Sequence, residues 1–155
     1  MDFVFLTERP DALPAIAAWY FDAWGHRRPG MTLADAREGL QDYLNRDKLP
    51  LMLLAVEGDE LIGAAQLKYR EMSIYPDREH WLGGVYVADA YRGRRIASQL
   101  VERVVALARG FRVETLHLQT VREDGGLYAR LGWQACEQVR YKGEDVLVMS
   151  RDIDD

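Results

Sequence analysis

The sequence has little cysteine, no long apolar run and no excess of positive charge. Cys136 is the single cysteine among 155 residues, which excludes an internal disulfide framework and a cysteine cluster for zinc. The longest apolar stretch, LMLLAV at 51–56, is far shorter than the roughly 20 residues of a membrane-spanning helix. The segment MDFVFLTERP lacks the basic start and apolar core of a signal peptide. We therefore expect a cytoplasmic protein without a metal site or membrane association.

The charge balance is acidic. The chain carries 20 Lys and Arg against 25 Asp and Glu, a formal net charge of −5. Proteins that bind nucleic acid usually present a basic face, so this balance disfavours that class, whereas it suits a cationic substrate. No repeat, low-complexity tract or Pro/Gly/Ser-rich linker divides the chain. We interpret residues 1–155 as a single domain.

Hydrophobic periodicity and turn signals predict a mixed α/β domain around one sheet. Apolar residues at helical spacing predict helices over 13–24, after a Thr32 cap, over 95–110 and, briefly, at GLYARL before Gly132. Apolar runs predict strands at 3–7, twice within 49–70, at 81–87 and at 113–120, then a hairpin that turns near Lys142 and Gly143. The apolar face of the 95–110 helix is expected to be Ile96, Leu100, Val101, Val104, Val105 and Ala108.

A basic loop at the start of the 95–110 helix contrasts with the acidic background. In YRGRRIAS, residues 91–98, three arginines surround Gly93. The first N–H groups of a helix lack partners within it and attract anions. The arginines could simply decorate a solvated helix terminus, but cations there are unfavourable by roughly 0.3–1 kcal/mol each. The loop therefore predicts a phosphate site, in which Gly93 permits close approach and the guanidinium groups add bidentate contacts.

Several of these segments together carry a family resemblance. The strand WLGGVYV, the loop ADAYRGRRIA, its helix and the later LYARLGW resemble the GNAT superfamily of acetyl-CoA-dependent N-acyltransferases. Arg92 opens and Ala97 closes that family's phosphate loop, Q/R-x-x-G-x-G/A. The element order matches over nearly the whole chain. The resemblance implies a central, mostly antiparallel sheet of about six to seven strands with splayed middle strands, flanked by about four helices.

The resemblance also implies where acetyl-CoA binds. The phosphates would lie against Arg92, Gly93, Arg94, Arg95, Ile96, Ala97 and Ser98. The pantetheine arm would pair with the exposed backbone of Val85, Tyr86 and Val87 as an added strand. Independently, adjacent glycines at 83–84 inside a strand indicate a bulge or a close backbone approach.

Two positions depart from the family pattern. Arg95 occupies the central glycine position, and because a long side chain disfavours positive φ, we expect Arg95 to be helical already, with its N–H still facing the phosphates. Val121 replaces an asparagine that many relatives carry, so one pantetheine contact is lost or supplied by Thr120.

The resemblance assigns catalytic roles with one gap. Tyr128 matches the tyrosine that donates a proton, or a hydrogen bond, to the departing sulfur. Direct attack needs an uncharged amine, so a base must take its proton. The position of the family's glutamate base is Trp81 here, which leaves Glu79 as the first substitute and His80 and His117 as weaker ones. Cys136, with no nearby histidine in the sequence, is expected to be an inert thiol rather than a nucleophile.

Two other classes of function stay open at this stage. The missing glutamate and the altered glycine permit a non-catalytic acyl-CoA-binding or sensing module, and the arginines permit a nucleic-acid binder. For an enzyme, the amine acceptor could be an aminoglycoside, a polyamine, an amino acid or a protein N-terminus. The sequence does not fix the oligomeric state, and a homodimer is one option.

Overall fold

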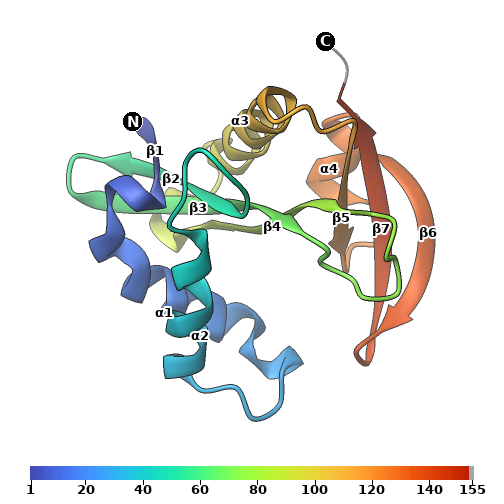
Figure 1. Cartoon of the computed structure of the whole chain (residues 1–155), viewed down its shortest axis with the longest axis horizontal. Helices are drawn as coiled ribbons and strands as arrows, with labels where there is room; N and C mark the ends of the chain where they lie inside the picture. Colours follow the sequence, from blue (N-terminus) through green and yellow to red (C-terminus); the bar gives the residue numbers. More distant parts are fainter. Residues whose placement is uncertain (154–155) are drawn as a thin grey trace.

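A computed structural model describes residues 1–153, which form a mixed α/β fold (Figure 1). The strands are β1 (Asp2–Phe5), β2 (Leu51–Glu57), β3 (Glu60–Tyr69), β4 (His80–Val87), β5 (Thr115–Thr120), β6 (Gln134–Tyr141) and β7 (Glu144–Asp152). The helices are α1 (Leu13–Trp24), α2 (Leu33–Leu40), α3 (Ile96–Gly110) and α4 (Gly126–Arg130). This confirms the predicted element order, although the first strand ends at Phe5 and α3 begins at Ile96.

All strands belong to one seven-stranded sheet in the order β1-β2-β3-β4-β5-β7-β6. Every neighbouring pair is antiparallel except β4 and β5, which are parallel. The predicted mixed fold with a mostly antiparallel sheet is therefore confirmed. The hairpin from β6 to β7 turns at Lys142 and Gly143, which both have positive φ, as the sequence indicated.

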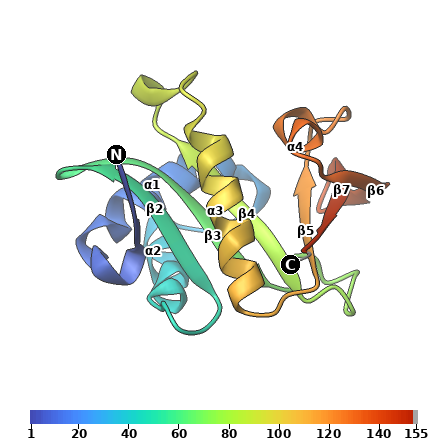
Figure 2. The same ribbon diagram turned by 90° about the horizontal axis from the view of Figure 1, so that it is seen from above.

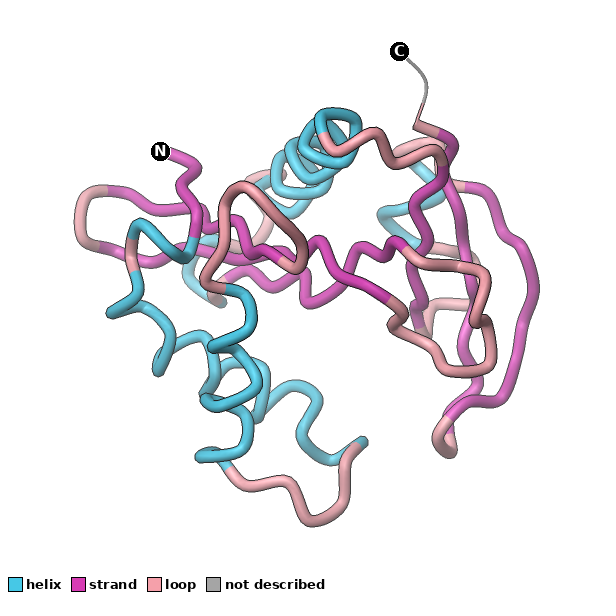
Figure 3. Tube along the Cα trace, viewed as in Figure 1, coloured by secondary structure: helices cyan, strands magenta, loops and turns pink. Residues whose placement is uncertain are grey.

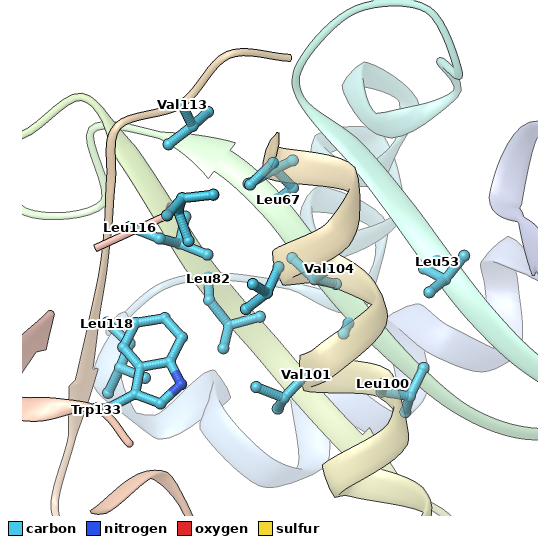
Figure 4. Packing of buried hydrophobic residues seen from close by; sticks show 14 of the residues in the cluster. Leu53, Leu67, Leu82, Leu100, Val101, Val104, Val113, Leu116, Leu118 and Trp133 are labelled. Carbon is cyan, nitrogen blue, oxygen red and sulfur yellow. The ribbon is translucent and has the colours of Figure 1, made fainter. Parts of the chain in front are cut away.

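Helix α3 covers one face of the sheet. Its buried residues are those predicted from periodicity, Ile96, Leu100, Val101, Val104, Val105 and Ala108. Figure 4 shows Leu100, Val101 and Val104 packed toward Leu67 and Leu82 of β3 and β4. Full burial of a Leu or Val side chain contributes about 1.5–3 kcal/mol, so this layer fixes α3 against the middle strands.

Helices α1 and α2 cover the opposite face (Figures 1 and 3). Alternate residues of β2 serve the two faces, Leu53 packing with α3 and Met52 with α1 and α2. The N-terminus of α2 is capped as predicted, because the Thr32 hydroxyl accepts the Asp35 N–H at 3.1 Å and the Asp35 carboxylate accepts the Thr32 N–H at 3.0 Å. None of the helices in residues 1–153 is long and apolar enough to cross a membrane.

Candidate active site

Strands β4 and β5 meet briefly and then diverge. Trp81 of β4 lies opposite His117 of β5, the one position in the described chain where these two strands pair. Beyond it they separate, as Figure 2 shows. A pocket of about 510 Å³ opens there, with residues 82–85 on the β4 wall and 118–121 on the β5 wall. The splayed middle strands expected from the sequence are present.

The β4 wall carries a bulge at its two glycines. The pairing register with β3 shifts between Ala64 and Gln66, and Gly84 has a φ of +56°. A Cβ at Gly84 would lie 2.7 Å from the Tyr20 hydroxyl and 2.8 Å from Oε1 of Gln66. The glycines therefore do mark a bulge, and the groups that approach Gly84 are side chains of α1 and β3.

Past the bulge, β4 turns part of its backbone away from β3. The Ala88 N–H donates to the Ile62 carbonyl at 2.8 Å, so the alternation of an antiparallel ladder directs the Val87 groups to the open side. The Val87 carbonyl accepts a 3.0 Å hydrogen bond from Nε of Arg92. Val85 lines the pocket directly. Both positions can offer main-chain groups to an extended ligand.

Tyr86 differs from its two neighbours. It pairs with Ala64 of β3, and its ring stacks on Trp19 of α1 with centroids 4.9 Å apart. The Arg92 guanidinium lies 5.6 Å from the same ring. Tyr86 therefore supports the loop that follows β4 and lies outside the pocket lining.

The loop before α3 keeps its backbone donors free. Within residues 1–153, no protein acceptor binds the N–H groups of 93–98, and no side chain caps α3. Arg95, the N-cap residue, has φ 61° and ψ 24°. The expectation that Arg95 is helical is therefore wrong. Burial of Ile96 fixes the start of α3, and we attribute the tolerated local strain, roughly 1–2 kcal/mol for a left-handed residue, to that packing.

The three arginines of this loop are not equally available. Arg92 forms a 2.7 Å ion pair with Asp89 in addition to its bond to β4. The Arg94 guanidinium packs 5.3 Å from the Tyr91 ring. Arg95 is exposed, with no side-chain partner in the described part of the chain. Two of the three guanidinium groups thus already contact other protein groups, whereas the N–H groups of 93–98 are free of any acceptor in residues 1–153. We therefore regard these N–H groups, more than the arginine side chains, as the anion site.

Tyr128 reaches the pocket from α4. It lines the β5 side of the cavity, and burial raises its pKa to about 12. Its hydroxyl has no hydrogen-bond partner among the residues that the structure describes. Thr120 and Val121 line the same wall. The Thr120 hydroxyl already accepts the Arg122 N–H at 3.2 Å, whereas Val121 is 49% exposed.

The structure does not bring the predicted bases into the pocket. Glu79 precedes β4, is half exposed and lies 3.5 Å from Arg70. His80 packs against Tyr69 outside the pocket lining. His117 lies against Trp81 where β4 and β5 meet, and burial lowers its pKa. Sequence spacing placed Glu79 on the strand, but the chain enters the sheet only at the following residue.

A polar group that sequence reasoning missed lies on the α1/α2 side of the pocket. Lys68 of β3 forms a 3.1 Å ion pair with Glu71, and both side chains are 16% exposed. Burial acts to lower the pKa of Lys68, but attraction to Glu71 and Tyr43, together with the hydrogen bond to Glu71, outweighs it, so the pKa is raised. Gln66 is buried on the same strand. The sequence feature that could have indicated this group is the pair of polar residues, Gln66 and Lys68, at alternate positions of an otherwise apolar strand.

A second ion pair crosses the pocket between the turn after α1 and the start of β7. Arg27, in the turn after α1, lies 2.7 Å from Glu144 at the start of β7, and His26 lies 3.7 Å from the same carboxylate. Arg27 and Glu144 both line the cavity. In Figure 1 the end of α1 approaches the β6–β7 hairpin below β4. This end of the pocket is therefore bridged by side chains.

Comparison with known proteins agrees with this architecture. An aminoglycoside 6'-N-acetyltransferase complexed with coenzyme A has a TM-score of 0.77 at 14% identity, covering 100% of this chain and 98% of that one. A ribosomal-protein-alanine N-acetyltransferase from Brucella melitensis gives 0.73 at 24%, covering 98% and 99%. An N-acetyltransferase from Staphylococcus aureus Mu50 gives 0.73 at 19%, covering 99% and 100%. These identities show a shared fold.

Sequence evidence places the chain more firmly. No curated protein is significantly similar to it in sequence. The acetyltransferase (GNAT) family, however, matches residues 13–133, which include the pocket strands, the arginine loop and Tyr128. The resemblance inferred from the strand, the loop and LYARLGW is thereby confirmed, and the chain belongs to the acetyltransferase (GNAT) family.

Proposed function

We propose that this acetyltransferase transfers an acetyl group from acetyl-CoA to the primary amine of a small molecule, by direct attack within a ternary complex. One observation carries the proposal: the free N–H groups of 93–98 stand at the end of the strand that forms one wall of the pocket. The N–H groups can bind the phosphates of a ligand, and the adjacent strand can bind its extended arm. A non-catalytic acyl-CoA-binding module is not favoured by the family assignment.

The residues present fit coenzyme A. In the proposal, the N–H groups of 93–98 bind the pyrophosphate, including that of Ile96, whose side chain is buried. The main-chain groups of Val85 and Val87 bind the arm, and Thr120 lines its other side. Nε of Arg92 donates to the Val87 carbonyl, so an arm that pairs with Val87 competes with that contact. Bound there, acetyl-CoA supplies a thioester that amines can attack.

Tyr128 is placed to assist the leaving sulfur. A phenol with a pKa of about 12 stays protonated at any ordinary assay pH. It can donate a hydrogen bond to negative charge that develops on the sulfur, and a buried donor stabilises such charge more than water does. We therefore retain Tyr128 as a catalytic residue. Glu79, which lies outside the pocket, has no part in the proposal.

The pocket favours a small acceptor with a single positive charge. Its charged lining residues balance: Arg27, Arg28, Lys68 and Lys142 against Asp35, Asp42, Glu71 and Glu144. A polyamine or aminoglycoside would bring several charges that this lining does not offset. The ion pair between Arg27 and Glu144 also bridges one end of the pocket, where we place the acceptor. Because this bridge narrows access, it disfavours a folded protein as substrate.

The proposal is tested first by binding. Acetyl-CoA at 1,000 times its dissociation constant should stabilise the native protein by about 4 kcal/mol, visible as a raised melting temperature. Arg92→Glu combined with Arg94→Glu should abolish this shift. The matched control is Arg37→Glu with Arg103→Glu, which makes the same charge change elsewhere and should preserve it.

Turnover is tested second. Release of free CoA thiol is measured with 2-phenylethylamine, a monoamine, and with spermidine, a polyamine. We expect the monoamine to be the better substrate. Absence of any acetyl-CoA shift, or of thiol release with a panel of primary amines, would refute the enzyme proposal. The cytoplasmic location, the lack of nucleic-acid binding and the oligomeric state stay predictions.

A further inference from the structure

Glu71 presents one of its carboxylate oxygens to the pocket. Oε1 accepts a 3.1 Å hydrogen bond from Nζ of Lys68. Oε2 lies 3.0 Å from the point that a Cβ of Gly83 would occupy. Within residues 1–153 no donor binds Oε2. One carboxylate oxygen is thus bound by Lys68, and the other is free. The free oxygen lies beside Gly83 of β4, where β4 diverges from β5.

The other acidic side chains of the pocket are differently placed. Glu144 is engaged with Arg27, and the Asp35 carboxylate caps α2 by accepting the Thr32 N–H at 3.0 Å. Asp42 is exposed. Glu71 is therefore the one pocket acid, in the described part of the chain, that is both mostly buried and open on one oxygen.

We infer that Glu71 binds the ammonium group of the acceptor and takes its proton. The inference rests on the proposed function. The groups around Glu71 are Lys68 from β3, Tyr43 from the turn after α2, and Arg28 beyond α1. The raised pKa of Lys68 keeps it a cation, so it orients Glu71 and does not compete for the proton.

The proton transfer balances with the acetyl transfer. The bound ammonium first loses one proton to Oε2 of Glu71, which passes it to solvent, because only an uncharged amine can attack. The amine nitrogen then forms a bond to the acetyl carbon and loses its second proton to the same oxygen as that bond makes the nitrogen acidic, and the carbon–sulfur bond breaks. The departing sulfur accepts a hydrogen bond from Tyr128 and ends as a thiol with a proton from solvent. Glu71 returns its own proton to solvent through the pocket mouth.

The deciding experiment compares Glu71→Gln with Glu79→Gln. Both variants neutralise a glutamate of the same β3–β4 connection, but Glu79 lies outside the pocket. With 2-phenylethylamine at pH 7, we expect kcat/KM to fall by about 10²-fold for Glu71→Gln and by less than about twofold for Glu79→Gln. The dissociation constant of acetyl-CoA should be unchanged in both.

The pH profile separates a base from a structural residue. The loss of kcat/KM in Glu71→Gln relative to the native protein should become smaller as the pH approaches about 10, because the amine then deprotonates without help. A deficit that is constant with pH, or one smaller than about threefold at pH 7, would overturn the inference. Glu71→Asp keeps a carboxylate and should retain part of the activity. This variant distinguishes loss of the base from loss of folding if Glu71→Gln is less stably folded than the native protein.

Binding gives a readout that does not depend on turnover. In the dead-end complex with CoA at pH 7, calorimetry should show 2-phenylethylamine binding to Glu71→Gln at least about tenfold more weakly than to the native protein. Equal binding contradicts an ammonium site at Glu71. If the native protein binds acetyl-CoA and acetylates amines while Glu71→Gln does so equally well, only this inference fails. If the native protein does neither, the proposed function fails first.

Discussion

The Tyr20 hydroxyl donates a 2.6 Å hydrogen bond to the Gly84 carbonyl, which joins α1 to the bulge of β4. Burial raises the pKa of Tyr20 far above its ordinary value, so the phenol stays a donor. The bond satisfies a carbonyl that the bulge removes from the sheet ladder. A single contact thus links the helical layer to the strand that lines the pocket.

Removing this hydroxyl should destabilise the fold. Tyr20→Phe leaves the Gly84 carbonyl without its partner, and we expect the free energy of unfolding to fall by about 1–3 kcal/mol. Urea denaturation measures the change. Tyr69→Phe, at a tyrosine that is 48% exposed, is the control and should stay within about 0.5 kcal/mol of the native protein. Equal midpoints for the two variants would show that the contact contributes little.

The left-handed conformation of Arg95 predicts an ordering of two variants. Arg95→Ala and Arg95→Gly both remove the guanidinium group, but only glycine relieves the strain at φ 61°. We expect Arg95→Gly to be more stable than Arg95→Ala by about 1 kcal/mol in urea denaturation. If alanine is as stable as glycine, the backbone at Arg95 is not strained.

The same pair of variants tests how the phosphates are held. If the N–H groups of 93–98 provide most of the affinity, the dissociation constant of acetyl-CoA should change by less than about fivefold in Arg95→Gly. Calorimetric titration gives the value. A loss of about 100-fold or more would mean that the side chain, and not the main chain, is the principal anion contact.

Replacing Tyr128 should affect turnover and spare binding. Tyr128→Phe is expected to lower kcat by about 10²-fold, the usual effect of losing one donor to developing negative charge. The acetyl-CoA dissociation constant should stay within about twofold. Because the phenol has a pKa of about 12, its contribution should be constant between pH 7 and pH 10. Parallel losses in kcat and in affinity would instead indicate a packing role against Trp133.

Restoring the family's asparagine should strengthen binding. Val121 is 49% exposed and lines the β5 wall. In the proposed binding mode, an amide at this position would reach the polar groups of the pantetheine arm. Val121→Asn should lower the dissociation constant of acetyl-CoA by about three- to tenfold, the value of one hydrogen bond. Val121→Ala controls for the loss of the isopropyl group. No gain over alanine would place the arm away from this residue.

Local patterns in the sequence predicted most of the architecture. The six buried positions of α3 follow from helical spacing, because burying one apolar stripe decides how a helix faces its sheet. The Thr32 cap and the turn at Lys142 and Gly143 follow from residue types that suit those conformations. Each of these features is encoded within a few neighbouring residues.

The candidate site was predicted only in part, because it joins segments that are distant along the chain. Tyr128 and the 92–98 loop belong to local motifs, and their proposed roles were predicted from those motifs. Glu71, in contrast, meets Gly83 only because β3 and β4 pair across a ten-residue connection. Glu79 was chosen by its distance in sequence from Trp81, but the chain places its side chain near Arg70.

The sequence by itself thus determined the family, the order of elements, the buried faces and the position of the arginine loop before α3, since each depends on short-range pattern. Tertiary structure alone decided two features: the left-handed Arg95 and the approach of Glu71 to Gly83. Packing between distant segments can outweigh a local preference of about 1–2 kcal/mol, and it fixes which polar side chains share a pocket.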